Sequence, residues 1–216
     1  HFEGASITHA QLLARIEAFG CALASLGVGP GDRVGLFLAN SPEFLIARWA
    51  AIRLGATAAP MNVMFQARET QYVLNNAAPR VLVTESAVLP LVEQVWPDCP
   101  HLEHLIVADA DIHGVRSFAQ LEQRHAGQHV PVHDCEPDAV CDLYYTSGTT
   151  GNPKGVMLTH KNLVTNIISS AATIQIGLED VMLSFLPLSH SFERMAGYYT
   201  GMSVGATIAY AESVET

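Results

Sequence analysis

The chain has 216 residues, of which 49% are hydrophobic and 15% charged, and its formal net charge is −10. This length allows a substantial core in one or two domains, and the composition is that of a globular protein rather than a disordered one. Eleven basic residues against 21 acidic ones leave no basic face, so nucleic acid is excluded as a partner. The net charge also repels ATP, so any nucleotide site needs donors gathered at short range.

The cysteines and the hydropathy pattern indicate the cellular compartment in which the protein is expected. The four cysteines show no C-x-x-C spacing, so reduced thiols are expected. The first residues lack the basic and apolar segments of a signal peptide. Arg48 and Arg53 interrupt the most apolar stretch, so a membrane span is not expected. We expect a cytoplasmic protein whose membrane association, if it has any, is peripheral.

Helical and strand-like patterns alternate along most of the chain. Thr8 and Gln11 fit a capping box, and Gly27 fits the end of the helix that follows. The predicted helices cover residues 8–26, 42–54, 67–76, 88–96, 118–125, 159–174 and 192–202. The predicted strands cover residues 33–38, 57–60, 81–84, 105–108, 140–145, 156–158, 181–186 and 206–210. This alternation predicts an α/β fold with a mostly parallel sheet flanked by helices.

Residues 145–155, Tyr-Thr-Ser-Gly-Thr-Thr-Gly-Asn-Pro-Lys-Gly, are the most informative stretch. They follow an apolar, strand-like run that only Asp142 interrupts. Their three glycines let the backbone approach a ligand closely. The Ser and Thr hydroxyls and the backbone N–H groups supply donors, and Lys154 adds a positive charge. Such a set of groups suits a polyphosphate, whose many oxygens need many donors.

Two other interpretations of this stretch were weighed. A Walker-type P-loop does not fit, because Pro153 stands where the second glycine belongs and Gly155 stands where the Ser or Thr belongs. A simple Gly-rich hairpin turn between two strands is the structural alternative. The density of hydroxyl groups beside Lys154 favours the phosphate-binding interpretation.

Two segments resemble a known family. Residues 145–164, YTSGTTGNPKGVMLTHKNLV, resemble the phosphate-binding signature of the adenylate-forming superfamily, which includes acyl-CoA synthetases, luciferases and peptide-synthetase adenylation domains. Residues 186–194, LPLSHSFER, resemble long-chain fatty acyl-CoA synthetases. The resemblance implies part of the N-terminal region of the acyl-CoA synthetase fold. Residues 30–177 would form one αβ subdomain, and residues 1–29 and 178–216 would be incomplete parts of a second one.

The resemblance also implies an activity and its site residues. A fatty carboxylate would attack ATP to give an acyl-adenylate and pyrophosphate, and coenzyme A would then displace AMP, with Mg²⁺ assisting. Lys154 and His190 are the candidate catalytic residues, the latter lining the carboxylate and acyl pocket, and Thr149 is the candidate Mg²⁺ ligand. The candidate phosphate-binding residues are Thr146, Ser147, Gly148, Thr149, Thr150, Gly151 and Lys154.

Each assignment has a structural alternative. Lys154 could be a solvated turn lysine, and His190 a surface-loop histidine. Glu193 and Arg194 could simply pair at a helix start. Four further residues could line an acyl tunnel or form an ordinary core-facing helix stripe: Met195, Gly197, Tyr198 and Gly201.

The function has alternatives as well. Within the same chemistry, the protein could be a medium-chain, aryl or peptide-synthetase-type adenylating enzyme. From a different class, it could be a non-catalytic nucleotide-binding module that retains the loop. The expected substrates are small molecules, namely a fatty acid, ATP and coenzyme A.

Family members are much longer than this chain, so we expect residues 1–216 to be an N-terminal fragment without the adenine and ribose contacts. Half of a nucleotide site offers too few contacts to hold ATP tightly. The isolated fragment is therefore predicted to give no turnover in a pyrophosphate-exchange assay with a fatty acid. Exchange above the protein-free background would contradict this prediction.

Overall fold

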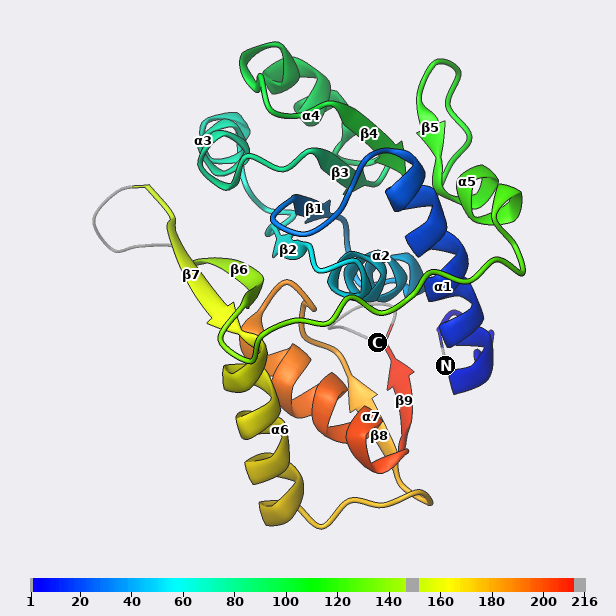
Figure 1. Ribbon diagram of the computed structural model, residues 1–216. Helices are drawn as coiled ribbons and strands as arrows, with labels where there is room; N and C mark the ends of the chain where they lie inside the picture. The colour runs from blue at the N-terminus through cyan, green and yellow to red at the C-terminus, as the bar shows by residue number, and fades with distance from the viewer. Residues whose placement is uncertain (1, 147–151, 212–216) are drawn as a thin grey trace.

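A seven-stranded sheet lies at the centre of the described part of the chain (Figure 1). The structure is a computed structural model that describes residues 2–146 and 152–211. The strand order is β5-β4-β3-β1-β2-β6-β7. All neighbouring strands pair in parallel except β6 and β7, which are antiparallel. The predicted α/β fold with a mostly parallel sheet flanked by helices is confirmed. The strands are β1 (Arg33–Phe37), β2 (Thr57–Pro60), β3 (Val81–Thr84), β4 (His104–Val107), β5 (Arg116–Ser117), β6 (Val140–Thr146) and β7 (Lys154–Thr159).

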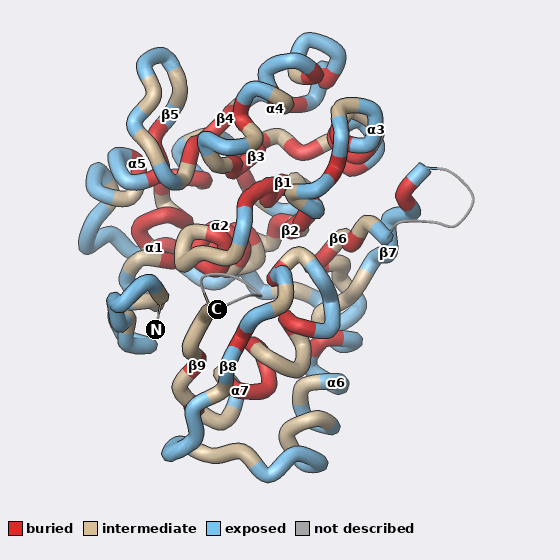
Figure 2. Tube along the Cα trace, turned by 180° about the vertical axis from the view of Figure 1, so that it is seen from behind, coloured by how far each residue is buried: buried red, intermediate tan, exposed pale blue. Residues whose placement is uncertain are grey.

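Helices cover both faces of this sheet. Because side chains alternate along a strand, β3 sends Val81 and Val83 into one apolar core and Leu82 into another. Figure 2 shows the buried segments concentrated at the centre of the molecule. The first core includes side chains from helices α1 (His9–Ser25), α2 (Pro42–Arg53) and α5 (Phe118–Arg124), and it extends to residues of the helices described below. The second core includes side chains from α3 (Ala67–Ala77) and α4 (Leu89–Val95), the latter continued by a short 3₁₀ turn, Trp96–Asp98.

The helix ends form where local chemistry predicts them. The Thr8 hydroxyl accepts a hydrogen bond from the backbone N–H of Gln11 at 3.2 Å, and the Gln11 side chain accepts one from the Thr8 N–H at 2.9 Å. Ser41 caps α2 by accepting from the N–H of Phe44, with proline at the first helical position. Gly27 has a φ of 82°, a left-handed conformation that favours glycine.

A second, two-stranded parallel sheet follows, made of β8 (Val181–Ser184) and β9 (Thr207–Tyr210). The helix expected over residues 192–202 between them begins as a π-helix, Glu193–Tyr199, labelled η2 here, and ends as α7 (Thr200–Val204). Gly197 leaves room for the Glu193 carboxylate, with which a Cβ at this position would collide. Helix α6 (His160–Thr173) packs against η2 and α7. Pi-helical turns are rare and frequently lie at functional sites.

Helix α1 packs along α2 and α5. Arg15 forms ion pairs with Glu122 on α5 at 2.6 Å and with Glu43 on α2 at 2.9 Å. Phe19 stacks on Phe118 with 3.9 Å between the ring centroids.

The division of the chain into residues 30–177 and two flanking parts stays a prediction.

Strand β7 is an outer strand of the described sheet, and its Met157 side chain is 68% exposed. Among the described residues, no helix is long and apolar enough to cross a membrane.

Helix α6 depends on its cap. The Thr159 hydroxyl accepts from the N–H of Asn162 at 3.2 Å, and the Asn162 side chain accepts from the Thr159 N–H at 3.0 Å. Replacing Thr159 by Ala removes one partner of this capping box and should lower the free energy of unfolding by about 1 kcal/mol. Denaturant unfolding measures the change. The Thr159→Ser variant keeps the hydroxyl and should lose much less, and equal losses would contradict the capping role.

Candidate functional site

The β6–β7 hairpin places the predicted phosphate-binding segment at the carboxyl edge of the sheet. Thr146 pairs with Lys154 in the antiparallel register, so the two residues lie opposite each other. Strand β6 runs parallel to β2, and ligands of parallel α/β sheets bind beyond the carboxyl ends of the strands. The hairpin that was the structural alternative does form, and it lies at the edge that the functional interpretation requires. Five predicted binding residues lie outside the described residues: Ser147, Gly148, Thr149, Thr150 and Gly151.

Lys154 and Thr146 are both exposed at the end of this hairpin. Lys154 forms no ion pair with any residue in the ranges 2–146 and 152–211. An ammonium group free in this way can contact an anion without first giving up a carboxylate partner.

The two faces of β6 have different neighbours. Tyr145, on one face, donates a hydrogen bond to the Asn76 side chain of α3 at 2.7 Å, and burial raises its pKa to about 12. Asp142, Tyr144 and Thr146 alternate with it and share the opposite face. Asp142 and Tyr144 on that face approach Arg194 of η2, whereas the predicted phosphate ligand Thr146 is exposed at the end of the same row.

A cavity of about 1,030 Å³ lies between β6, α6 and η2. We call it the α6 cavity. Of the four side chains considered for an acyl tunnel, only Met195 lines it, whereas Tyr198 turns toward α2 and Gly201 packs against Met182 and Ile208. Its apolar or aromatic lining residues are Tyr144, Leu158, Leu163, Phe192, Met195, Ala196 and Tyr199. The remaining lining residues are polar and come mostly from α6.

His190 is exposed at the start of η2. Its ring Nδ1 accepts a hydrogen bond from the backbone N–H of Phe192 at 3.3 Å, and the backbone N–H of His190 donates to the Pro187 carbonyl at 2.8 Å. The next two residues, Ser191 and Phe192, line the α6 cavity, but the His190 side chain does not. His190 thus holds the backbone at Phe192, the residue that directly precedes η2, whose side chains form part of the cavity wall.

Asn40 was missed by the sequence analysis, although it follows a buried strand directly. Its side-chain N–H donates to the Leu186 carbonyl at 2.8 Å, and its side-chain oxygen accepts from the Leu188 N–H at 2.6 Å. Because Asn40 lies just beyond the carboxyl end of β1, these two bonds hold the segment leading to His190 against the same sheet edge as the hairpin.

Three charged side chains lie fully buried beneath the cavity wall. Arg48, Asp142 and Arg194 are each 0% exposed. Arg48 donates two hydrogen bonds to the Asp142 carboxylate, at 2.5 and 3.3 Å, whereas Arg194 approaches it only to 3.9 Å. The suggested pairing of Glu193 with Arg194 is not found among the described residues, because Arg194 turns toward Asp142 instead.

The pKa values of the two buried arginines shift in opposite directions. Burial by itself lowers the pKa of both guanidinium groups. For Arg48, attraction to Asp142 and Tyr199 and the hydrogen bonds to Asp142 outweigh this effect, so its pKa is raised above the usual value. For Arg194 burial prevails, and its pKa falls to about 10. Both groups remain cationic at neutral pH.

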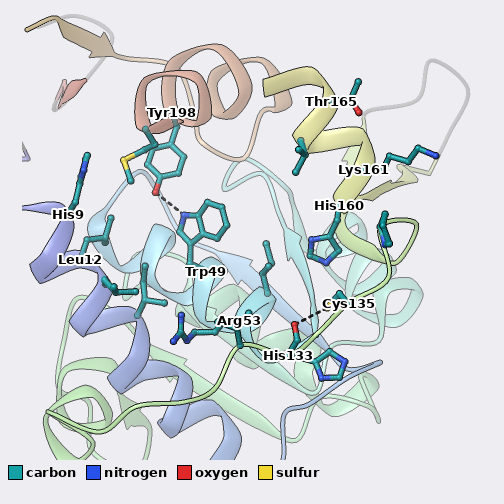
Figure 3. Close-up of a pocket in the computed structure, with 17 residues that line it drawn as sticks. His9, Leu12, Trp49, Arg53, His133, Cys135, His160, Lys161, Thr165 and Tyr198 are labelled. Atoms are coloured by element: carbon teal, nitrogen blue, oxygen red, sulfur yellow. Dashed lines mark hydrogen bonds between the residues drawn. The ribbon is translucent and has the colours of Figure 1, made fainter. Parts of the chain in front are cut away.

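A second cavity, of about 780 Å³, lies between α1, α2, α6 and the segment 132–137 (Figure 3). Across it, the indole N–H of Trp49 donates to the Tyr198 hydroxyl at 2.8 Å. Thr146, Lys154 and His190 line neither this cavity nor the α6 cavity, but the α6 cavity is lined by Tyr144 of the hairpin strand β6 and by Ser191 and Phe192, which follow His190 directly. We therefore place the candidate site at the α6 cavity rather than here.

The described residues contain no group of three or more His, Cys, Asp or Glu side chains that could hold a metal ion. The predicted Mg²⁺ ligand, Thr149, lies outside them.

These features define an α/β protein with a Gly-, Ser- and Thr-rich hairpin at the carboxyl edge of a parallel sheet and a cavity beside it. A family model described as "AMP-binding enzyme" matches residues 1–216, so the chain belongs to the AMP-binding enzyme family.

Among curated relatives, the chain is 34% identical to fatty acyl-CoA synthetase A of Dictyostelium discoideum in an alignment that covers 87% of this chain and 30% of the relative. It is 31% identical to crotonobetaine/carnitine–CoA ligase of Escherichia fergusonii over 87% of this chain and 37% of the relative. Of the solved structures, anthranilate CoA ligase AuaEII with anthranoyl-AMP superposes with a TM-score of 0.88 at 27% identity, covering 96% of this chain and 39% of that one. The chain thus spans little more than a third of the length of these proteins at most.

Removing the shared carboxylate should be costly. The Asp142→Asn variant leaves Arg48 and Arg194 buried without a counter-charge, and we expect a loss of about 3–5 kcal/mol in the free energy of unfolding. Asp138→Asn, at a carboxylate whose side chain is 79% exposed and which pairs with Lys161 at 3.8 Å, should change it by less than about 0.5 kcal/mol. Denaturant unfolding compares the two, and similar small losses would contradict the role of Asp142.

Proposed function

We propose that the protein carrying this chain is an acid–thiol ligase that uses ATP to activate a fatty carboxylate and then transfers the acyl group to coenzyme A. The observation that carries the proposal is that the two strands ending at Thr146 and Lys154 also contribute Tyr144 and Leu158 to the wall of the partly apolar α6 cavity. An anion site next to a cavity lined by Phe192 and Met195 suits a substrate with a carboxylate at one end and an apolar chain at the other.

The hairpin is proposed to hold the triphosphate. The hydroxyls of Thr146, Ser147, Thr149 and Thr150 and the backbone at Gly148 and Gly151 would donate to phosphate oxygens. Lys154 would stabilise the charge that develops on the departing pyrophosphate while the carboxylate oxygen attacks the α-phosphate. Such phosphoryl chemistry depends on positioning and charge neutralisation rather than on covalent help from side chains.

The hydroxyl oxygen of Thr149 is the kind of hard ligand that Mg²⁺ accepts, although the described residues add no carboxylate cluster to it. Thr149 would therefore supply one ligand, with phosphate oxygens, water and a carboxylate outside this chain supplying the others. When bound, the ion would neutralise phosphate charge. Coenzyme A is the proposed co-substrate of the second step.

The acyl substrate is proposed to enter the α6 cavity. His190 would act through its hydrogen bond to the backbone of Phe192, which lines the cavity together with Met195. The relatives include a fatty acyl-CoA synthetase, a crotonobetaine/carnitine–CoA ligase and an anthranilate CoA ligase, so their names alone do not select the substrate. The HSFER run at 190–194 favours a fatty chain. Competition among fatty, aryl and amino acids in the full-length protein tests this preference.

A cytoplasmic location is proposed with this function, since fatty acid, ATP and coenzyme A are the only partners that it needs. Any membrane contact is proposed to be peripheral.

Replacing Lys154 by Ala in the full-length protein should lower the rate of carboxylate-dependent pyrophosphate exchange by about a hundredfold, because a charge-stabilising donor is lost. Lys154 is exposed, so the melting temperature should not change. Arg124→Ala, which removes an exposed positive charge at the end of α5, is the control and should keep full activity. A non-catalytic nucleotide-binding module would show no carboxylate-dependent exchange in either variant or in the unmutated protein.

A further inference from the structure

Arg194 lies in an environment that is unfavourable for a charged side chain. Its side chain is 0% exposed, and none of its three guanidinium nitrogens has a hydrogen-bond partner among the described residues. Leaving buried donors unpaired is costly, and a buried cation is more costly still. An apolar side chain of similar size would fill the same space without that cost. The charge of Arg194 therefore calls for a reason other than packing.

The local charges do not balance around Arg194. Asp142 accepts two hydrogen bonds from Arg48, at 2.5 and 3.3 Å, and lies 3.9 Å from the nearest nitrogen of Arg194. Two buried cations thus share one carboxylate. Glu193 is also buried, but it lies against Gly197 and, with burial and Tyr198, contributes to a raised pKa of Tyr210 on β9. It forms no ion pair with either arginine in the described residues.

The unpaired guanidinium of Arg194 lies directly behind the wall of the α6 cavity. The Arg194 guanidinium is 3.9 Å from the ring centroid of Tyr144, and that of Arg48 is 4.7 Å from the ring of Tyr199. Both tyrosines line the cavity, whereas neither arginine does. A charge in a low-dielectric interior acts over a longer range than one in water, so the cavity is exposed to its field. Tyr144 is also two residues from Thr146 on the same face of β6, where the phosphate site is proposed to begin.

We propose that Arg194 determines specificity for a carboxylate in the α6 cavity, by attracting the anionic end of the acyl substrate from behind Tyr144 without touching it. The inference rests on the proposed function for the identity of the substrate. It adds a selection step that precedes chemistry: a fatty acid is favoured over an uncharged molecule with the same chain. This attraction also counters, locally, the repulsion that a chain of net charge −10 exerts on anions.

The test measures binding in the full-length protein without ATP, using dodecanoate and its uncharged analogue dodecanamide as probes. The unmutated protein should prefer dodecanoate. The Arg194→Met variant should lose about tenfold of that preference, through weaker binding of dodecanoate with unchanged binding of dodecanamide. Arg194→Lys keeps the charge and should retain most of the preference. Arg68→Met, which removes an exposed charge on α3, controls for net charge and should leave the preference intact.

Thermal unfolding separates this role from a structural one. Because Met replaces an incompletely paired buried cation with an apolar side chain, Arg194→Met should melt at the same temperature as the unmutated protein or higher. If Arg194→Met loses the preference for dodecanoate without a lower melting temperature, the inference is supported. The inference is overturned if the unmutated protein binds both probes equally, if Arg194→Met keeps the preference, or if Arg194→Met melts lower and Lys does not rescue the preference.

The same proteins distinguish this inference from the proposed function. Carboxylate-dependent pyrophosphate exchange by the unmutated protein tests the ligase activity alone. A preference for dodecanoate that depends on Arg194, in a protein without exchange, would refute the ligase and leave the selection step standing. If the KM for ATP rose in Arg194→Met as much as the KM for the fatty acid, the charge would serve the phosphates, and the assignment to the carboxylate would be wrong.

Discussion

The buried carboxylate of Asp142 is the interaction on which the candidate site depends. It accepts two hydrogen bonds from Arg48 of α2 and faces Arg194 of η2, so that one side chain of β6 joins three elements. Two of these elements bound the α6 cavity, and the third packs against the sheet that carries the hairpin. Without it, the cavity wall would keep two buried cations that nothing neutralises. Loss of this carboxylate alone is therefore costly, because it leaves buried cations without a counter-charge in an interior that is otherwise apolar.

A second contact, smaller but equally specific, fixes the segment before η2. Asn40 satisfies one donor and one acceptor of the backbone around residue 187, and thereby brings the end of β8 to the carboxyl edge of the larger sheet. Backbone groups in such a connecting segment need partners, and a single amide side chain supplies both. The hairpin, the η2 helix and the cavity between them are in this way parts of one edge, although their residues come from distant parts of the chain.

Features that depend on interactions between residues close in the sequence could be predicted, whereas those that depend on distant residues could not. The capping box at Thr8 and the glycine at position 27 act over a few residues, and the ends of the first helix lie where they indicate. The parallel sheet follows from the alternation of helices and apolar strands. In contrast, Asp142 was visible only as an interruption in a strand and Arg48 only as a break in an apolar stretch. Their pairing joins residues 94 positions apart, which no local pattern encodes. The π-helix was not predicted, because over so few residues its spacing of apolar side chains resembles that of an α-helix. The predicted roles of the loop residues remain predictions.

The outer position of β7 has a consequence for the behaviour of the protein in solution. Such a strand presents backbone donors and acceptors that its own sheet leaves open on one side, and Val156 and Met157 add exposed apolar surface beside them. These are the ingredients by which strands of separate molecules join. Lys154, at the start of the strand, places a charge that discourages such stacking. An anion bound at Lys154, as proposed, would cancel this charge and so remove a barrier to pairing between strands of separate molecules.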